Sequence, residues 1–254
     1  MDVELDGSLD SQGMVLDFAL VKRQVKETID RYFDHKLLVP SGHPRCRVAH
    51  VGRETEIELQ LDSGAKIHHL APDSATTLVA ATGINPVTLS DAIVASIRPT
   101  LPANVEQLRL RLYPEAIDGA WYRYSHGLKH HEGNCQRIAH GHRSRIRIFR
   151  DGEPSPSLEQ AWARRWRDIY LGTGEDLMER FDLDGETYCR FGYAAAQGRF
   201  ELTLPASQCY LIDCDSTVEN LARHIAETLK RENPGSRFRV MAFEGVDKGA
   251  IGEA

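Results

Sequence analysis

The sequence lacks the hydrophobic segments that mark membrane and secreted proteins. It contains no run of 18 or more apolar residues, the minimum for a membrane-spanning helix. Its first 30 residues contain no basic stretch followed by an apolar one, so no secretory leader is predicted. We therefore expect a soluble, cytoplasmic protein.

Cysteine and net positive charge are also scarce. The 254 residues include five cysteines, an odd number with no C-x-x-C pair, which argues against a disulfide framework. Most of these thiols are expected to be reduced and buried. A net charge of -6 and a pI near 6.0 argue against a general nucleic-acid binder, because such binding depends on Lys and Arg neutralising phosphates. A small anionic substrate is still compatible with this charge.

Short strands and amphipathic helices run through the chain. Residues 17–33 place apolar side chains at helical spacing behind Asp17, which is suited to the N-cap. The alternating runs 3–5 and 14–16, separated by a turn-rich segment, are expected to pair as strands. Further strands are predicted at 55–61, 65–70, 76–81, 108–113, 198–204, 209–213 and 237–243, and further helices at 88–98, 158–170 and 216–230.

The order of these elements recurs in the second half of the chain. Segments 87–115 and 216–244 have equal length, and their alignment matches Thr88 with Thr217 and Glu115 with Glu244. Such a duplication predicts two similar modules, 1–118 and 119–254. The first module begins at Val3 without a full partner for its opening hairpin, so its N-terminal strand is expected to be incomplete.

The segment 124–142 contains most of the residues suited to metal chemistry. His140 and His142 point to one face of a strand because side chains alternate with period two, and His126 on a preceding strand could supply a third nitrogen. Three protein ligands with an open fourth position are typical of catalytic zinc. Chance pairing of two of the chain's 11 histidines is the alternative.

Several other residues have both a chemical and a structural interpretation. Cys135, close to the proposed ion, could act as a thiolate base or be a buried structural cysteine. Asp34 and His35 could form a proton relay, or His35 could simply face the dipole at the end of a helix. Glu115 and Glu244 could be exposed edge carboxylates. Ser216 and Glu219 have the spacing of a capping box.

Taken together, these fragments resemble the 6-pyruvoyl/6-carboxytetrahydropterin synthases. The resemblance is carried by G-M-V-L-D-F (13–18), F-D-H-K-L-L (33–38), Y-S-H-G-L (124–128), C-Q-R-I-A-H-G-H (135–142), D-S-T-V-E-N-L-A (215–222) and F-E-G (243–245). It implies an α+β tunnelling fold in each module: antiparallel sheets with helices on one face, assembling into a barrel-forming homo-oligomer. The motif order departs from the family pattern, since the Asp-His motif precedes the histidine motif. A duplicated chain explains this order, with the relay in the first module and the zinc site in the second.

The resemblance also implies residue roles and a reaction. Zn²⁺ would be held by His126, His140 and His142, with Cys135 as the base and Asp34 and His35 as the supporting relay. The pterin would be bound by Glu244 or Glu115, with Thr217 beside them. The implied enzyme is a lyase that converts 7,8-dihydroneopterin triphosphate to 6-carboxytetrahydropterin for queuosine-type nucleoside synthesis. Two alternatives are a 6-pyruvoyltetrahydropterin synthase and a non-catalytic pterin or purine binder with structural zinc. No nucleic-acid or membrane partner is expected.

Overall fold

The first half of the chain forms two small sheets and half of a larger one, in a computed structural model that describes residues 1–254. Strand β1 (Asp2–Gly7) pairs antiparallel with β7 (Val105–Arg111), and β2 (Leu37–Pro40) pairs parallel with β6 (Thr76–Val79). The remaining elements are β3 (Cys46–Val51), β4 (Glu54–Gln60), β5 (Lys66–Pro72), the helices α1 (Phe18–Tyr32) and α2 (Pro86–Ile97), and the short 3-10 helices η1 (Asp73–Ala75) and η2 (Arg98–Thr100).

The second half follows the same order with a more complete sheet. Four strands, in the order β8-β9-β16-β17, pair antiparallel, and β11 extends this sheet by pairing parallel with β8 and β15. The elements are β8 (Trp121–His126), η3 (Asn134–Gln136), β9 (His140–Arg150), β10 (Glu153–Pro154), α3 (Pro156–Arg165), β11 (Arg167–Thr173), β12 (Leu177–Leu183), β13 (Glu186–Ala195), β14 (Gly198–Pro205), η4 (Ala206–Gln208), β15 (Cys209–Ile212), α4 (Val218–Glu232), β16 (Phe238–Gly245) and β17 (Lys248–Glu253).

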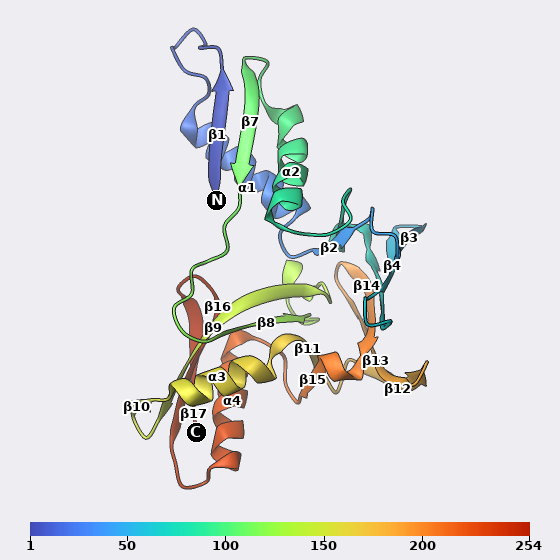
Figure 1. Cartoon of the computed structure of the whole chain (residues 1–254), viewed down its shortest axis with the longest axis vertical. Helices are drawn as coiled ribbons and strands as arrows, with labels where there is room; N and C mark the ends of the chain where they lie inside the picture. The colour runs from blue at the N-terminus through green and yellow to red at the C-terminus, as the bar shows by residue number, and fades with distance from the viewer.

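One sheet joins the two halves. Strands β5 and β14 pair antiparallel, with His69 opposite Leu202, and so create a six-stranded sheet in the order β12-β13-β14-β5-β4-β3. Figure 1 shows this sheet to one side of the molecule, while the β1–β7 pair and the β8–β9–β16 sheet are separated along its long axis. The contact between the halves is therefore made by backbone hydrogen bonds as well as side chains.

Each half has its own hydrophobic core. In the second half, α3 and α4 cover one face of the β8–β9–β16 sheet, and the fully buried Trp162 and Trp166 lie in that core. A smaller core lies between α1, α2 and the β1–β7 pair, and a third includes residues of β13 and β14. Helices on one face of an antiparallel sheet agree with the expected architecture, although the parallel pairs make the sheets mixed and the chain alone contains no closed barrel.

Most predicted elements are present, but two of them and the prediction for the cysteines are wrong. Residues 14–16 form no strand, and β1 pairs with β7 instead, since the intervening turn is closed locally by a hydrogen bond from Asp10 N to Met14 O. The helix predicted at 158–170 ends at Arg165, and residues 167–173 form β11. Only Cys189 of the five thiols is buried; the others are partly exposed.

The caps of the helices explain where the sequence repeat was misaligned. Asp17 caps α1 as predicted, accepting from the backbone N–H groups of Ala19 and Leu20. Helix α4 is capped by Thr217 rather than Ser216, and α2 is capped by Asn85. The two caps are 132 residues apart (217 − 85 = 132), whereas the sequence alignment of 87–115 with 216–244 has an offset of 129 (216 − 87 = 129). The odd offset of 129 would also align buried Leu110 of β7 with an exposed position of β16, because burial in a strand alternates with period two. Glu115 consequently lies in the linker beyond β7 and does not correspond to Glu244.

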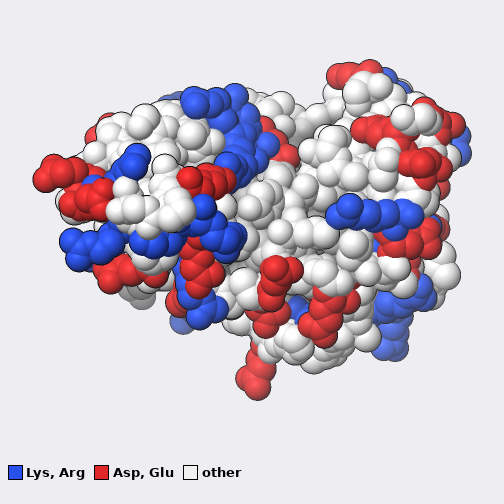
Figure 2. All heavy atoms as spheres, turned by 90° about the horizontal axis from the view of Figure 1, so that it is seen from below, with Lys and Arg blue, Asp and Glu red and all other residues white.

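None of the helices combines the length and the apolar composition that a membrane span requires. The face of the molecule in Figure 2 carries basic and acidic side chains interspersed, without a continuous surface of one sign.

Candidate metal centre and its surroundings

Strands β8 and β9 bring three histidines together. These strands pair antiparallel with His126 opposite His140 and Tyr124 opposite His142. Because side chains alternate along a strand, His140 and His142 share the face on which His126 also lies. The ring centroids are 4.3 Å apart for His126 and His140, 5.0 Å for His126 and His142, and 5.2 Å for His140 and His142.

Two of the three imidazoles are buried and that of His142 is partly exposed, and each has one buried nitrogen left unpaired. His126 and His140 are 0% and 2% exposed, and the Nε2 atoms of all three histidines lack a hydrogen-bond partner. The other nitrogens are occupied in two of them: His126 Nδ1 lies 2.8 Å from Ser216 Oγ, and His140 Nδ1 lies 2.8 Å from the Arg137 carbonyl. A carbonyl can only accept, so His140 carries its proton on Nδ1 and directs the lone pair of Nε2 toward the other two histidines.

Burial keeps these imidazoles neutral. It lowers the pKa of His140 to about 3 and that of His142 to about 4, and it holds the pKa of His126 well below its ordinary value, with the neighbouring histidines adding to the effect. Neutral imidazole is the form that binds transition metals. Three converging, buried and unpaired nitrogens are costly without a partner, and a cation bound by them would remove that cost. The residues therefore fit a metal ion, and their donor atoms lie within 4.8 Å of one another.

A second group of chemically active side chains adjoins the histidines. His35, Cys135 and His140 also place their donor atoms within 4.8 Å of one another, and the ring of His35 lies 5.2 Å from that of His140. His35 belongs to the first half of the chain, at the end of α1, whereas Cys135 belongs to the second. The structure thus brings the two motifs together within one chain.

His35 is held between Cys135 and Asp34. Its Nδ1 lies 2.6 Å from Asp34 Oδ2, which leaves Nε2 for the thiol. The neighbouring Cys135 thiol is the largest cause that raises the pKa of His35 to about 9; Asp34 adds to it and burial opposes it. His35 also has a left-handed backbone, with φ of 52°, which costs on the order of 1 kcal/mol for a residue with a Cβ atom. That strain points the imidazole at the second half of the chain.

The predicted substrate residues lie at different distances from this centre. Glu244 Oε1 is 3.4 Å from His142 Nε2, without the alignment of a hydrogen bond, and burial, followed by the charge of Glu219, raises the pKa of Glu244. Thr217 lies next to Ser216, the residue that contacts His126, but its own hydroxyl accepts from Asn220 N. Glu115 lies in the linker, where its carbonyl accepts from Arg143.

Sequence reasoning missed two residues that hold the site. Ser216 was interpreted as half of a capping box, and it instead contacts His126. No sequence motif marks Arg137, although it lies between Cys135 and His140 and contacts both halves of the chain. The sequence indicates this contact only through the position of Arg137 three residues before His140, since a metal-binding histidine usually donates its second N–H to a nearby carbonyl.

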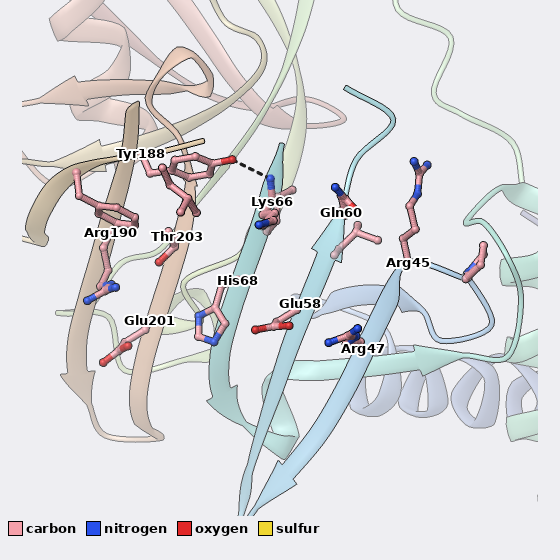
Figure 3. Close-up of a pocket in the computed structure, with 15 residues that line it drawn as sticks. Arg45, Arg47, Glu58, Gln60, Lys66, His68, Tyr188, Arg190, Glu201 and Thr203 are labelled. Atoms are coloured by element: carbon pink, nitrogen blue, oxygen red, sulfur yellow. Dashed lines mark hydrogen bonds between the residues drawn. The ribbon is translucent and has the colours of Figure 1, made fainter. Parts of the chain in front are cut away.

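Two cavities accompany the six-stranded sheet. One of about 510 Å³ lies between the halves and is bordered by His142, Gly141 and Tyr124 from the second half and by Leu37 and Ile67 from the first. A larger one of about 820 Å³ lies over β3, β4, β5, β13 and β14, and none of His126, His140 and His142 lines it (Figure 3).

Basic side chains outnumber acidic ones in the lining of the larger cavity, with Arg45, Arg47, Lys66 and Arg190 against Glu58 and Glu201, but three of the basic ones lie near carboxylates outside the lining. Arg190 lies near Glu179, Lys66 near Asp184, and Arg45 pairs with Asp62. In Figure 3 the labelled side chains of the cavity line strands on both sides of the junction between the halves, with the Tyr188 hydroxyl accepting from Lys66 N at 2.9 Å. Ion pairs with carboxylates outside the lining therefore offset part of the positive charge of this cavity.

Comparison with known proteins assigns the family. The sequence model of the family described as 6-pyruvoyl tetrahydropterin synthase matches the chain twice, over residues 1–123 and 119–251. No curated protein sequence matches. Similar solved structures include a catalytic-residue variant of Plasmodium vivax 6-pyruvoyltetrahydropterin synthase (13% identity, TM-score 0.39) and the Plasmodium falciparum 6-pyruvoyl tetrahydropterin synthase (11% identity, TM-score 0.38). Each alignment covers 53% of this chain and 91% of the other. Because the two sequence matches together span nearly the whole chain, the protein belongs to the 6-pyruvoyl tetrahydropterin synthase family, as a duplicated member.

Proposed function

We propose that the chain is a zinc-dependent pterin synthase that converts 7,8-dihydroneopterin triphosphate to 6-carboxytetrahydropterin. The observation that carries this proposal is the convergence of three unpaired histidine nitrogens beside the Asp34–His35–Cys135 chain. A binding protein would need a pocket but not a thiol, an imidazole and a carboxylate in contact. Family membership supplies the pterin class of substrate and the lyase class of reaction.

Each residue of the site has a chemical role in this proposal. His126, His140 and His142 would hold Zn²⁺, which when bound polarises oxygen atoms of the substrate side chain. Cys135 acts as the base that removes a carbon-bound proton, and His35, with Asp34 behind it, places a positive charge against the thiol and moves protons to and from it. Glu244 is the better pterin anchor because it lies beside His142, where its carboxylate could accept paired N–H groups of the ring.

The domain organisation belongs to the same proposal. We assign residues 1–118 to a module that supplies the relay and 119–254 to a module that supplies the metal ligands, the thiol and the pterin anchor. From here these are the first and second modules.

A barrel would require several chains. Strand β17 pairs only with β16, and β1 only with β7, so each sheet has an open edge able to pair with another copy. We propose that copies of the chain close a barrel through these edges, as expected for the family. Light scattering on the purified protein should show a closed oligomer at micromolar concentration; a monomer would contradict this part.

Product analysis tests the reaction. The purified protein should consume the triphosphate and yield 6-carboxytetrahydropterin with release of acetaldehyde, measured by mass spectrometry and an aldehyde assay. A 6-pyruvoyl product without acetaldehyde would favour the second candidate, a 6-pyruvoyltetrahydropterin synthase, which the description of the family favours. Binding without turnover would indicate a pterin binder.

Metal analysis tests the cofactor. The native protein should contain about one zinc ion per chain, since the three histidines occur once, and His140→Ala should lose it. Exchange of the exposed His50 for Ala is the matched control and should retain the metal. Two ions per chain, or none after gentle purification, would contradict the assignment.

A further inference from the structure

Arg137 connects the metal centre with the relay of the other module. It is only 7% exposed and lies on the segment between Cys135 and His140. Its carbonyl lies 2.8 Å from His140 Nδ1, while its guanidinium Nη1 donates to the carbonyls of Asp34 and His35 at 3.4 and 3.2 Å. One residue thus contacts a metal-site histidine through its backbone and the relay through its side chain.

The buried guanidinium has no carboxylate within ion-pair distance. Burial lowers the pKa of Arg137 and the charge of nearby Asp34 opposes that shift, so the site bears a desolvated cation compensated mainly by carbonyl groups. Such an arrangement is unfavourable unless its hydrogen bonds are well formed. The two carbonyls that accept from Arg137 flank the left-handed turn at His35, whose φ is 52°. The guanidinium therefore holds the backbone conformation that directs His35 toward Cys135.

Gln197, in the turn between β13 and β14, fixes this arrangement from the other side. Its Oε1 accepts from Arg137 Nε at 3.0 Å, its Nε2 donates to Asn134 Oδ1 at 2.9 Å, and its backbone N–H donates to Gln136 Oε1 at 2.7 Å. Gln136 is itself fully buried. The residues before and after Cys135 are therefore both tied to one hairpin, and so is the guanidinium.

We propose that Arg137, anchored by Gln197, is a positioning residue that sets the separation of His35 and Cys135 across the boundary between the modules. The proposal rests on the proposed function for the roles of His35 and Cys135. Arg137 does not act on the substrate in this account; it acts through His35.

Two substitutions separate positioning from general stability. Arg137→Met removes every side-chain donor but leaves the backbone carbonyl that contacts His140, so the metal content should stay at the wild-type value. We expect kcat to fall about 100-fold, as for a misplacement near 1 Å, with KM changed less than about threefold. Arg137→Lys, which restores one donor, should recover part of the loss. Arg199→Met, at the exposed position of β14, is the matched control and should behave as wild type.

A double-mutant cycle with His35→Gln tests the route of action. If Arg137 acts through His35, the double variant should be no slower than His35→Gln alone, within about threefold. A double variant slowed by the product of the two single effects would overturn the proposal, as would a loss of metal equal to the loss of kcat. If Arg137→Met does not fold, Gln197→Leu replaces it in the same cycle, with an expected loss of about tenfold and the same criterion.

A chemical readout keeps this test independent of the substrate. The rate at which iodoacetamide alkylates Cys135 in the folded full chain, followed by mass spectrometry of the peptide that contains Cys135, should fall in His35→Gln and in Arg137→Met, and no further in the double variant. If the wild type shows no pterin turnover but this cycle is non-additive, the proposed function fails and the positioning role stands. Additive alkylation rates would overturn the positioning role whatever the activity.

Discussion

The ends of α1 and α3 show the same backbone used for different chemistry. The first residue after η1 pairs with Leu37 of β2, and the first residue after η4 pairs with Tyr170 of β11. Leu37 and Tyr170 therefore occupy corresponding positions. Two residues earlier, the chain has His35 in one module and Asp168 in the other, with φ of 52° and 55°. His35 faces Cys135, whereas Asp168 forms an ion pair with Arg123 at 2.7 Å.

A second difference concerns the strand that carries His126. In the second module β8 lies between β11 and β9 and unites them in one sheet, while in the first module β2 and β1 remain in separate two-stranded sheets. The fold thus provides a repeated position for a relay side chain, but the setting for metal ligands exists once. After duplication, each module can keep a different part of one site.

The largest expected effect concerns the thiol of the second module. Cys135→Ala should lower kcat by about 10³-fold or more while zinc content and thermal unfolding stay unchanged, because the thiolate is proposed as a base and not as a ligand. Steady-state kinetics and metal analysis check this. Cys46→Ala in the first module and Cys209→Ala in the second are the controls and should remain active. Equal behaviour of all three variants would remove the special role of Cys135.

The next effect compares the two left-handed residues directly. His35→Gln should lower kcat about 100-fold, since it removes the group that moves protons at Cys135. Asp168→Asn, at the corresponding position, should change kcat less than about threefold, because its partner Arg123 lies on the face of β8 opposite His126. A large loss in Asp168→Asn would mean that both modules contribute a relay.

The two glutamates give a smaller contrast. Glu244→Gln should weaken pterin binding roughly 10-fold, the loss of a charge-assisted contact, whereas Glu115→Gln in the linker should leave it unchanged. Titration calorimetry with neopterin, an unreactive pterin, would measure both affinities. If Glu115→Gln shows the greater loss, the assignment of the anchor is wrong.

The smallest effect concerns the strands that join the modules. His69 on β5 is 1% exposed, its Nδ1 is unpaired, and it lies opposite Leu202 of β14. Burial, followed by the charge of His68, lowers the pKa of His69 to about 4. The unfolded chain binds the proton near pH 6.5 and the folded chain only near pH 4, so stability is full above pH 6.5 and falls as pH decreases through this window.

Between pH 7 and pH 5 this histidine should cost about 2 kcal/mol of unfolding free energy. Urea unfolding of the wild type and of His69→Leu at both pH values would isolate it, because other buried histidines contribute equally to both proteins. An identical pH dependence in the two proteins would show that His69 titrates normally.

The sequence predicted the local structure well and the contacts across the modules only in part. The helix behind Asp17 and the shared face of His140 and His142 follow from periodicity and capping, which are local properties. The pairing of β1 with β7 could not be found in this way, since its partners are about 100 residues apart and a turn near Met14 offered a closer alternative.

The environment of the candidate site shows the same limit. The identities of the histidines and of Asp34, His35 and Cys135 came from motifs, but the hold on His126 by Ser216 and on His35 by Arg137 depends on where distant segments meet. The equal-length repeat gave the wrong counterpart for Glu115. It aligned identical residue types, whereas the correct alignment of β7 with β16 follows from the alternation of buried and exposed residues.

The short linker between β7 and β8, residues 112–120, determines how the assembly of the site depends on protein concentration. Two separate subunits would have to meet before His35 could reach Cys135, and the fraction of assembled sites would then decrease on dilution. A tether this short gives the partner module an effective concentration in the millimolar range, independent of the amount of protein present. The encounter of relay and thiol thus becomes a property of folding one chain, and a cell that makes few copies of this protein would still have the pair formed in every one.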